Sequence, residues 1–563
     1  MSLLNDASIV ITPNGYNVGR LYAVIPSSGA ADMDVTRATA ATRVDENGLV
    51  NYAEVLGGEE DIDGNFPLPN TNWTLSGFTI SDNKLHCVSD GTYNNAIQSN
   101  VFVIGRTYKI TFDITGWTLG DIRVRPSGQS PFQLANANGS YTFYYTATNH
   151  QIAIERNSAC DMYLENLVVK EVTRDNVPRI DYTGGGCPHI LAEPMRTNLI
   201  PYSEDFTDSS WNFDGSNVNI TRTPNATTSP SGENNATKLI GNNTSKDPSN
   251  SYIGVSTSAA VPYTISIFAK KGEYDYLVSG LGGYGGGYYA VFNLSNGTVS
   301  TSPTASGTTA SIEDYGNGWY RCLVNTTNTG GSEILFVSPS VDGTLTTNYT
   351  NTTNGIYVWG GQVENGSYAT SYIPNFGTAL GVTRNQDIFT RDGIGSLINS
   401  TEGVLFVEMA ATSLSSNYDV ITLSDGTVSN IVAIFYLANT KSININVKQL
   451  GASVFSGFAS ATTYPPLDFH KIAVKYKTGD FALWIDGTEV LTGSGAMTNL
   501  GLSNLQLADG NGTSNKFFGK VKQLQVYDTS LSDEQLLQLT GESGTDFYES
   551  YAEMASALTY TIQ

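Results

Sequence analysis

The sequence has little basic charge, few cysteines and few histidines, and each shortage excludes a class of function. Lysine and arginine number 29 against 52 acidic residues, a net charge of −23. Nucleic acid is therefore not an expected partner, because phosphate binding needs a positive stripe. The four cysteines lack CxxC spacing, which argues against a zinc site or a disulfide framework, although a bridge between Cys87 and Cys160 stays open. The four histidines are isolated and no GxSxG motif occurs, so we expect no metal, no cofactor and no Ser-His-Asp hydrolase.

Long hydrophobic runs are also missing. The first residues, MSLLNDASIVITPNG, contain neither a basic start nor a long apolar core, so they do not form a secretory signal. No stretch approaches the roughly 20 apolar residues of a membrane span. We therefore expect a protein made in a cytoplasm, with no membrane partner.

Glycine and tyrosine are abundant instead, with 57 and 32 residues. Serine, threonine and asparagine are frequent between the short apolar stretches. Alternating segments such as TYKITFDITGW and SYTFYYTAT recur at a spacing of about 8–12 residues, which is typical of β-sandwiches. At about 150 residues per domain, 563 residues suggest three or four domains. The sequence thus predicts an all-β, multidomain protein.

Two copies of one jelly-roll-like unit are the economical interpretation of the first two thirds of the chain. Trp73 and Trp211 stand at equivalent positions, and TYKITFDI matches PYTISIFA at 262–269. The predicted organisation is an N-terminal segment at 1–66, a first jelly-roll sandwich at 67–174, an ordered connector at 175–202, a second jelly-roll sandwich at 203–375, a second connector at 376–402, a third sandwich at 403–541 and a tail at 542–563.

The first connector is rich in proline and carries the triplet Gly184, Gly185 and Gly186, so regular helix or strand is repeatedly interrupted there. It also carries apolar residues that a flexible tether would lack. We expect an ordered brace in which Arg179 and Arg196 form salt bridges or clamp the backbone; an ordinary interdomain loop is the alternative.

Exposed aromatic side chains are the candidate glycan-binding residues. The motif GLGGYG satisfies GxGxxG, but a strand follows it, so no helix N-terminus is present for a phosphate. We interpret it as a loop that displays Tyr284, Tyr288 and Tyr289, whose rings can stack on sugars. Trp117, beside a glycine at a strand end, is a second candidate. The alternative is that these aromatics cover a sandwich edge or a subunit contact.

The last strands resemble a known family. HKIAVKYKTGDFALWIDGTEV, followed by FFGKVKQLQVYDTSLSDEQLLQL, is similar to the closing strands and helix of ConA-like lectin and laminin-G-like domains. The resemblance implies a ConA-like sandwich at 403–541. A retaining β-glucanase on this fold would carry Glu-x-Asp-x(-x)-Glu on one strand. No such triplet occurs in this block, so we expect no catalytic residues and no enzyme activity.

The wider arrangement resembles tailed-bacteriophage fibre and virion-surface proteins. The opening segment, the connector VPRIDYTGGGCPHILAEPMRTNLIPYSEDF and the segment SYATSYIPNFGTALGVTRN carry this resemblance. It implies a virion protein assembled in the host cytoplasm, such as a tail fibre, head fibre or capsid decoration. Residues 1–66 would contact other virion proteins, the sandwiches would bind a host surface polysaccharide, and the chain would form a homotrimer. A polysaccharide depolymerase and a bacterial surface adhesin are the alternative functions.

Overall fold

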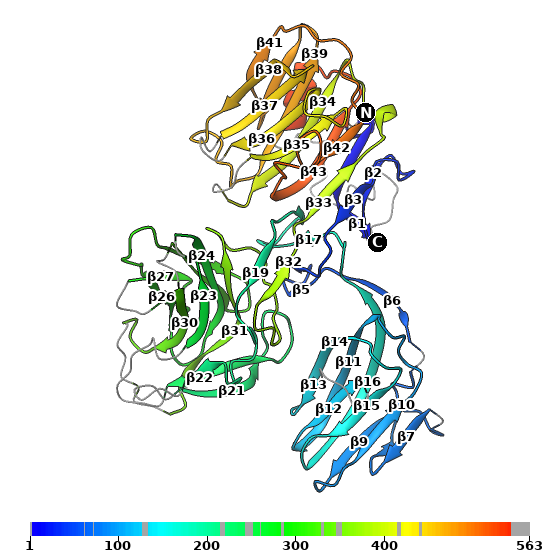
Figure 1. Ribbon diagram of the computed structural model, residues 1–563, viewed down its shortest axis with the longest axis vertical. Helices are drawn as coiled ribbons and strands as arrows, with labels where there is room; N and C mark the ends of the chain where they lie inside the picture. The colour runs from blue at the N-terminus through cyan, green and yellow to red at the C-terminus, as the bar shows by residue number, and fades with distance from the viewer. Residues whose placement is uncertain are drawn as a thin grey trace.

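The computed structural model describes residues 3–60, 62–70, 72–126, 133–213, 220–241, 252–258, 260–282, 287–327, 331–344, 349, 352–413, 418–437 and 442–541. In this part of the chain nearly all regular structure is β-strand, gathered into three sandwiches that meet at one junction (Figure 1). The predicted all-β class is confirmed. Among the same residues, no helix combines the length and apolarity that crossing a membrane requires.

The first sandwich buries one face of its long strands, and β11 (Thr107–Leu119) shows the alternation most clearly. In β11, Tyr108, Ile110, Phe112 and Ile114 point into the core. One sheet has the order β13 (Gln133–Ala135), β12 (Ile122–Pro126), β15 (Ile152–Arg156), β10 (Asn95–Gln98), β7 (Trp73–Ser76). The other has the order β14 (Gly139–Thr146), β11, β16 (Cys160–Thr173), β9 (Lys84–Ser89), β8 (Thr79–Ser81), with β6 (Val55–Glu59) also paired to β16.

The second sandwich repeats this strand order. Its first sheet runs β27 (Thr298–Thr301), β26 (Tyr289–Asn293), β25 (Tyr276–Leu281), β30 (Gly331–Ser340), β23 (Tyr252–Thr257), β20 (Trp211–Asn212). Its second runs β28 (Thr309–Asp314), β29 (Trp319–Thr327), β24 (Pro262–Lys271), β31 (Gly355–Asn365), β22 (Ala236–Gly241), β21 (Ile220–Thr227). Strands β29, β24, β31 and β22 occupy the places of β14, β11, β16 and β9, so the two sandwiches share one topology.

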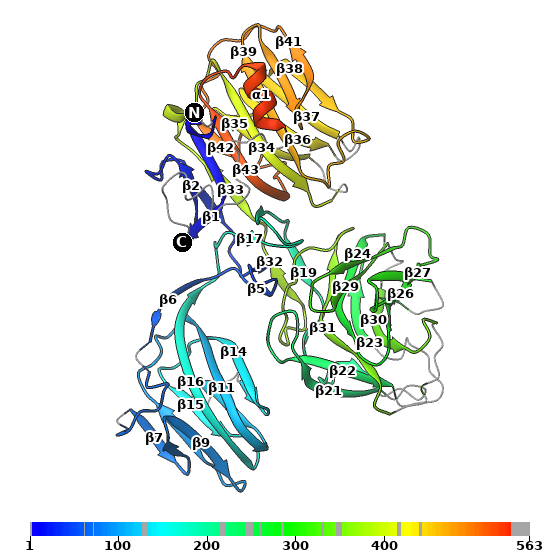
Figure 2. The ribbon, with the colours of Figure 1, turned by 180° about the vertical axis from the view of Figure 1, so that it is seen from behind.

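The C-terminal sandwich is built from strands at both ends of the chain. Its hydrogen-bonded path runs β38 (Ala452–Ala459), β37 (Ser442–Gln449), β36 (Ile431–Leu437), β35 (Tyr418–Ser424), β42 (Asn504–Gln506), β33 (Ile388–Arg391), β3 (Met33–Thr36), β2 (Arg20–Ile25), β1 (Ile9–Asn17), β43 (Gly519–Tyr527), β34 (Glu402–Ala411), β39 (His470–Lys477), β40 (Phe481–Ile485), β41 (Thr488–Gly493). Figure 2 shows the N-terminal strands lying along this sandwich.

The structure therefore corrects the predicted limits of the third sandwich, which extends beyond 403–541. Ile9 pairs with Val526 where β1 meets β43, and Val35 pairs with Phe389 where β3 meets β33. The N-terminal strands thus occupy two strand edges that would otherwise have unpaired backbone groups. The periodicity of the sequence does not reveal this strand pairing, because the paired residues are more than 300 positions apart. Residues 9–36 are therefore part of a folded domain rather than a separate segment.

Short elements complete the architecture. The 3₁₀ turn η1 (Leu3–Asp6) and the helix α1 (Asp533–Thr540) contribute apolar residues to one cluster on the outside of β34, β39 and β40. Ser532 and Gln535 form a reciprocal capping box that fixes the start of α1. Around the junction lie β4 (Thr42–Val44), β5 (Val50–Tyr52), β17 (Ile180–Asp181), β18 (His189–Leu191), β19 (Arg196–Asn198) and β32 (Val382–Arg384). The 3₁₀ turn η4 (Gly395–Leu397) lies instead beside the N-terminal segment, where the Leu397 carbonyl accepts from Ser8 Oγ at 2.6 Å.

The shared sheet predicts that an N-terminal substitution destabilises the C-terminal sandwich. Ile9 is fully buried in the same core cluster as residues of β34, β39 and β43. Replacement of Ile9 by alanine removes buried methyl groups and leaves a cavity, so we expect a loss of about 2–5 kcal/mol in the free energy of unfolding. Urea denaturation, with hydrogen exchange followed in β43, measures this loss.

Val18→Ala is the matched control. Val18 lies at the turn between β1 and β2 and is 39% exposed, so its truncation is expected to change stability by less than about 0.5 kcal/mol. If Ile9→Ala leaves exchange in β43 unchanged, the N-terminal strands do not support this sandwich.

Candidate functional site

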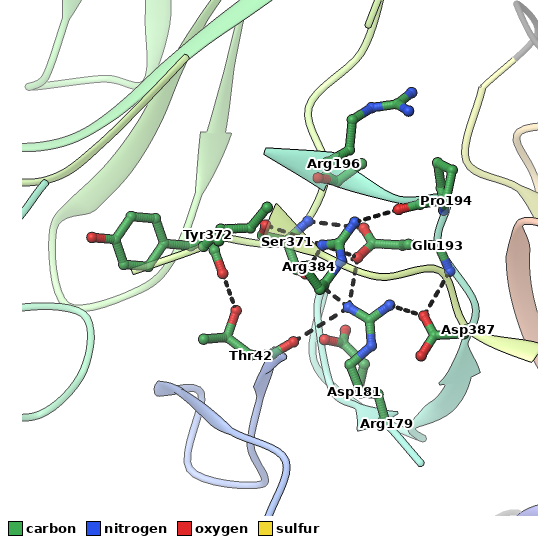
Figure 3. Close-up of polar contacts among 12 residues, drawn as sticks. Thr42, Arg179, Asp181, Glu193, Pro194, Arg196, Ser371, Tyr372, Arg384 and Asp387 are labelled. Atoms are coloured by element: carbon green, nitrogen blue, oxygen red, sulfur yellow. Dashed lines mark hydrogen bonds and ion pairs between the residues drawn. The ribbon is translucent and has the colours of Figure 1, made fainter. Parts of the chain in front are cut away.

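A buried cluster of arginines and carboxylates occupies the junction between the three sandwiches. It combines side chains from the segment after β3, from the first connector and from the second connector (Figure 3). Arg37, Arg179 and Arg384 are almost fully buried, as are Glu193 and Asp387. We call these five residues the arginine hub. Unpaired buried charges are costly, so their geometry decides whether the junction is stable.

Arg179 is the centre of the arginine hub. Its Nη1 lies 2.5 Å from Glu193 Oε2 and donates to Ser371 Oγ at 2.8 Å, while its Nη2 donates to an Asp387 carboxylate oxygen. Nη1 also donates to the Thr42 carbonyl at 3.4 Å, which links the N-terminal segment to both connectors. One guanidinium therefore holds three segments that are distant in sequence.

The other two arginines complete the charge pairing. Arg37 Nη1 lies 2.8 Å from Asp387 Oδ1, and Arg384 Nη1 lies 2.8 Å from Glu193 Oε2. Burial alone would raise the pKa of Glu193, but Arg384 and Arg179 outweigh burial and hold that pKa well below its usual range. The pKa of Asp387 is lowered in the same way, by Arg179 and Arg37. Both carboxyl groups are therefore ionised in the folded protein.

The connector residues singled out from the sequence lie around the arginine hub. Arg179 is its centre, whereas Arg196 lies at its edge, with Nε 3.7 Å from Glu364 Oε2 and its guanidinium over the Tyr368 ring. Gly184, Gly185 and Gly186 have φ of +91°, +73° and +74°, a region that disfavours side chains. The triplet therefore makes a turn that most other residues would strain.

Apolar residues also hold the first connector in place. Ile190 and Leu191 are buried in the strand β18, which pairs with β43 of the C-terminal sandwich. Leu199 is half-buried. Part of the first connector, the strand β18, is thus an additional strand of the C-terminal sandwich.

Sequence reasoning missed Arg37, Glu193 and Asp387 as members of the arginine hub. The ion pair of Arg37 with Asp387 spans 350 positions, so no local pattern reveals it. The triplet Val-Thr-Arg occurs at 35–37, 172–174 and 382–384. Arg37 and Arg384 lie in the hub, whereas Arg174 stacks on Tyr52 and Tyr144, so the triplet by itself does not identify the hub.

The aromatic candidates are spread over two sandwiches and do not converge. Trp117 is 37% exposed at the end of β11, and its indole nitrogen donates to the Gly120 carbonyl at 2.8 Å. Tyr288 and Tyr289 are half-buried beside β26, where the Tyr289 ring packs against Phe336 at 6.5 Å. Tyr284 lies outside the described residues. The predicted tyrosine cluster is therefore described only in part.

A more continuous aromatic surface lies on the outward face of the C-terminal sandwich. Val420, Phe435, Asn444 and Phe458 stand directly opposite one another across β35, β36, β37 and β38. Phe458 is 63% exposed. Tyr418, at 45% exposure, packs against Phe435 with ring centroids 5.8 Å apart. We call Tyr418, Phe435, Asn444 and Phe458 the aromatic face.

The loop after β42 covers one side of the aromatic face. Thr422 Oγ1 donates to the Ala508 carbonyl and Ser424 Oγ to the Gly510 carbonyl, each at 2.8 Å. Under this loop Val420 and Ile431 are buried, whereas the rings farther along the sheet stay open. The arrangement is a shallow apolar floor beside amide side chains, which suits the apolar side and the hydroxyl groups of a sugar ring.

Catalytic and metal chemistry has little support at either site. Within the described residues, no group of three or more His, Cys, Asp or Glu side chains is placed to hold a metal ion. Asp419, next to the aromatic face, is buried and accepts the Phe518 backbone N–H at 3.1 Å. A carboxylate occupied in this way is not positioned to attack or protonate a bound sugar.

The arginine hub predicts a large stability loss for Arg179→Met. The substitution removes the central cation and leaves Glu193 and Asp387 buried with fewer partners, so we expect a loss of about 3–5 kcal/mol. Urea unfolding at pH 7 measures the change.

Arg20→Met is the control for Arg179→Met, because Arg20 pairs with Asp34 at 2.5 Å but is 43% exposed. Exposed pairs contribute about 0–1 kcal/mol. Equal losses for the two variants would contradict the central role of Arg179.

Comparison with known proteins places the C-terminal sandwich in a family. The laminin-G-type family model described as the Concanavalin A-like lectin/glucanases superfamily matches residues 406–537. A search of curated proteins gave no match.

Solved structures with partial likeness are sialidase-related. The IT-sialidase CBM40 of Ruminococcus gnavus is 16% identical, with 25% of this chain and 84% of that chain covered and a TM-score of 0.23. The leech intramolecular trans-sialidase is 18% identical, with 26% and 24% covered and a TM-score of 0.23. The Trypanosoma rangeli sialidase is 10% identical, with 89% and 97% covered and a TM-score of 0.21. At these TM-scores the likenesses do not support any assignment of function.

The assignment therefore depends on the family match and on the strand arrangement around it. Residues 406–537 form a laminin-G-like domain of the concanavalin A-like lectin/glucanases superfamily, which strands from residues 9–36 complete in this chain.

Proposed function

We propose that this chain is a non-enzymatic bacteriophage virion protein that attaches to a host surface glycan through the aromatic face of its C-terminal sandwich. The single observation that carries the proposal is the row of Phe435, Asn444 and Phe458, with Tyr418 packed beside it. Planar rings bind the apolar side of a sugar, and neighbouring amides bind its hydroxyl groups. Singly exposed aromatics are common on surfaces, but aligned rings on an open sheet mark a binding surface.

The virion assignment is supported by the resemblance of the connectors to those of fibre proteins. It would place the chain in a tail fibre, a head fibre or a capsid decoration, assembled as a homotrimer. Contact with other virion proteins through residues 1–66 would use side-chain surface, because β1, β2 and β3 already pair with neighbouring strands. The net charge of −23 would help to keep a large assembly soluble.

A polysaccharide depolymerase is the competing proposal, and one observation bears on it. Glu204 and Glu233 lie near each other beside a polar cavity of about 70 Å³, and burial raises the pKa of both carboxyl groups. Pockets that bind small molecules usually measure about 300–1,000 Å³. This cavity is too small for a sugar ring, so we do not assign catalysis to this pair.

The aromatic face predicts that ring removal weakens glycan binding. An array of bacterial surface polysaccharides would first identify a ligand for the full-length protein. Tyr418→Ala and Phe458→Ala each remove one stacking ring, so we expect each to weaken binding of that ligand about 10-fold, or about 1.4 kcal/mol. Isothermal titration of the identified oligosaccharide measures both changes.

Leu450→Ala is the matched control for the ring substitutions. Leu450 is strongly exposed in the turn between β37 and β38, away from the row of rings. Its removal should leave the affinity unchanged. The glycan proposal would be contradicted if the protein binds no polysaccharide on the array. It would also be contradicted if both ring substitutions leave the affinity unchanged.

A further inference from the structure

The first sandwich is attached to the rest of the chain by two strands and a small set of contacts. Its connection runs through β6 on one side and through the end of β16 on the other. In Figure 2 the first and second sandwiches are separate lobes, with β14 on one and β21 and β22 on the other lying on the sides that face each other. The angle between the two lobes therefore depends on whatever joins them near this base.

An aromatic stack forms the first part of that joint. Tyr52, on β5, packs edge-to-face against Tyr144 of the first sandwich, with centroids 5.3 Å apart. The Arg174 guanidinium lies 4.3 Å from the Tyr52 ring and 4.2 Å from the Tyr144 ring. Glu54 accepts from Lys109 Nζ at 2.6 Å and from the Tyr144 hydroxyl at 2.8 Å. Lys109 and Glu54 therefore form an ion pair, and Arg174 interacts with both rings.

A polar contact between the lobes forms the second part. Asn225 Nδ2 donates to Asn136 Oδ1 at 2.9 Å, and a cavity of about 70 Å³ lies between the two lobes. Its lining comes from β14, from β21 and from the turn between β21 and β22, and comprises Ser140, Tyr141, Thr142, Asn225, Glu233, Asn234 and Asn235. Glu233 is thus placed directly between the two sandwiches.

Glu204 lies behind the cavity, next to Asn235, which is one of the residues that line it. Its Oε2 accepts from Asn235 Nδ2 at 3.2 Å, and its Oε1 accepts from the Tyr372 hydroxyl at 3.3 Å. Asn235 Oδ1 is buried with no hydrogen-bond partner among the described atoms. The groups that face Glu204 are hydroxyl, amide and indole groups and a second carboxyl; within the described chain no cation is paired with it.

We propose that Glu204 and Glu233 form a pH-sensitive latch, which holds the first sandwich against the second when the two carboxyl groups are protonated and releases it when they ionise. Ionisation would place two like charges beside a buried amide, at a joint whose nearby cations, Arg174 and Lys109, already interact with the aromatic stack and Glu54. Opening the joint would move the first sandwich away from Glu233 and admit water to the cavity that Glu233 and Asn235 line. This inference is independent of glycan binding.

The direction of the pH effect follows from the environment of the carboxyl groups. Burial raises the pKa of Glu204 to about 7, and Glu233 contributes to the rise. Burial also raises the pKa of Glu233, against opposing effects of Thr142 and Lys109. Between about 4.3, the ordinary pKa of glutamate, and about 7, the docked form binds more protons than the open form. Docking is therefore favoured below pH 7 and weakens as pH rises through it.

Distance measurements between spin labels test the latch. Ile104→Cys on the first sandwich and Ser300→Cys on the second provide two exposed labelling sites, and Cys187→Ser removes the exposed native thiol. In the full-length protein we expect one narrow distance distribution at pH 5.5 and at least a twofold broader one at pH 8.5. The double variant Glu204→Gln/Glu233→Gln should keep the narrow distribution at both pH values.

Two further variants make the result decisive. Glu489→Gln changes an exposed carboxylate on the C-terminal sandwich and should retain the full pH response. Glu233→Gln alone leaves one ionisable group, so it should reduce the broadening even if Glu204→Gln folds poorly. A wild-type distribution that is the same at both pH values, or a double variant that broadens as the wild type does, would overturn the proposal.

Discussion

The ion pairs of Arg179 with Glu193 and Asp387 are the contact on which the arrangement of this molecule depends. Each sandwich has its own apolar core, so burial stabilises the sandwiches separately but does not orient them. The arginine hub orients the sandwiches relative to one another, because its residues and their hydrogen-bond partners come from the N-terminal segment and from both connectors. Desolvated charges cost several kcal/mol unless they are paired, so the pairing geometry leaves few alternative arrangements of the connectors.

Local features of the fold could be predicted from the sequence, and long-range ones could not. Alternation in β11 and the matching tryptophans Trp73 and Trp211 indicated two equivalent sandwiches, since both signals are contained in a few adjacent residues. The pairing of the N-terminal strands with β43 and β33, and the pairing of Arg37 and Arg179 with Asp387, were missed because they join residues hundreds of positions apart. Phe435 was missed for another reason: the segment IVAIFYL is apolar throughout and does not reveal that one of its faces is open.

The architecture separates structural support from recognition. Charged residues are buried at the arginine hub, where they fix the connectors, and aromatic residues are exposed on the C-terminal sandwich, where they can meet a ligand. The first sandwich is held more weakly, through the Arg174 stack and the contact at Glu233. If the two proposals hold, a protein that attaches a large particle to a surface would combine a rigid base, a binding face and one lobe whose position responds to pH.

Hydrogen exchange at the arginine hub tests the central claim most directly. The Glu193 amide donates to Asp387 Oδ2 at 2.9 Å and the Ser371 amide donates to Glu193 Oε1 at 2.8 Å, although neither residue lies in a strand. If the hub is the rigid joint of the molecule, both amides should be protected as strongly as the core strands β24 and β34. Exchange at the rate of an exposed linker would show that the sandwiches are positioned by something other than the hub.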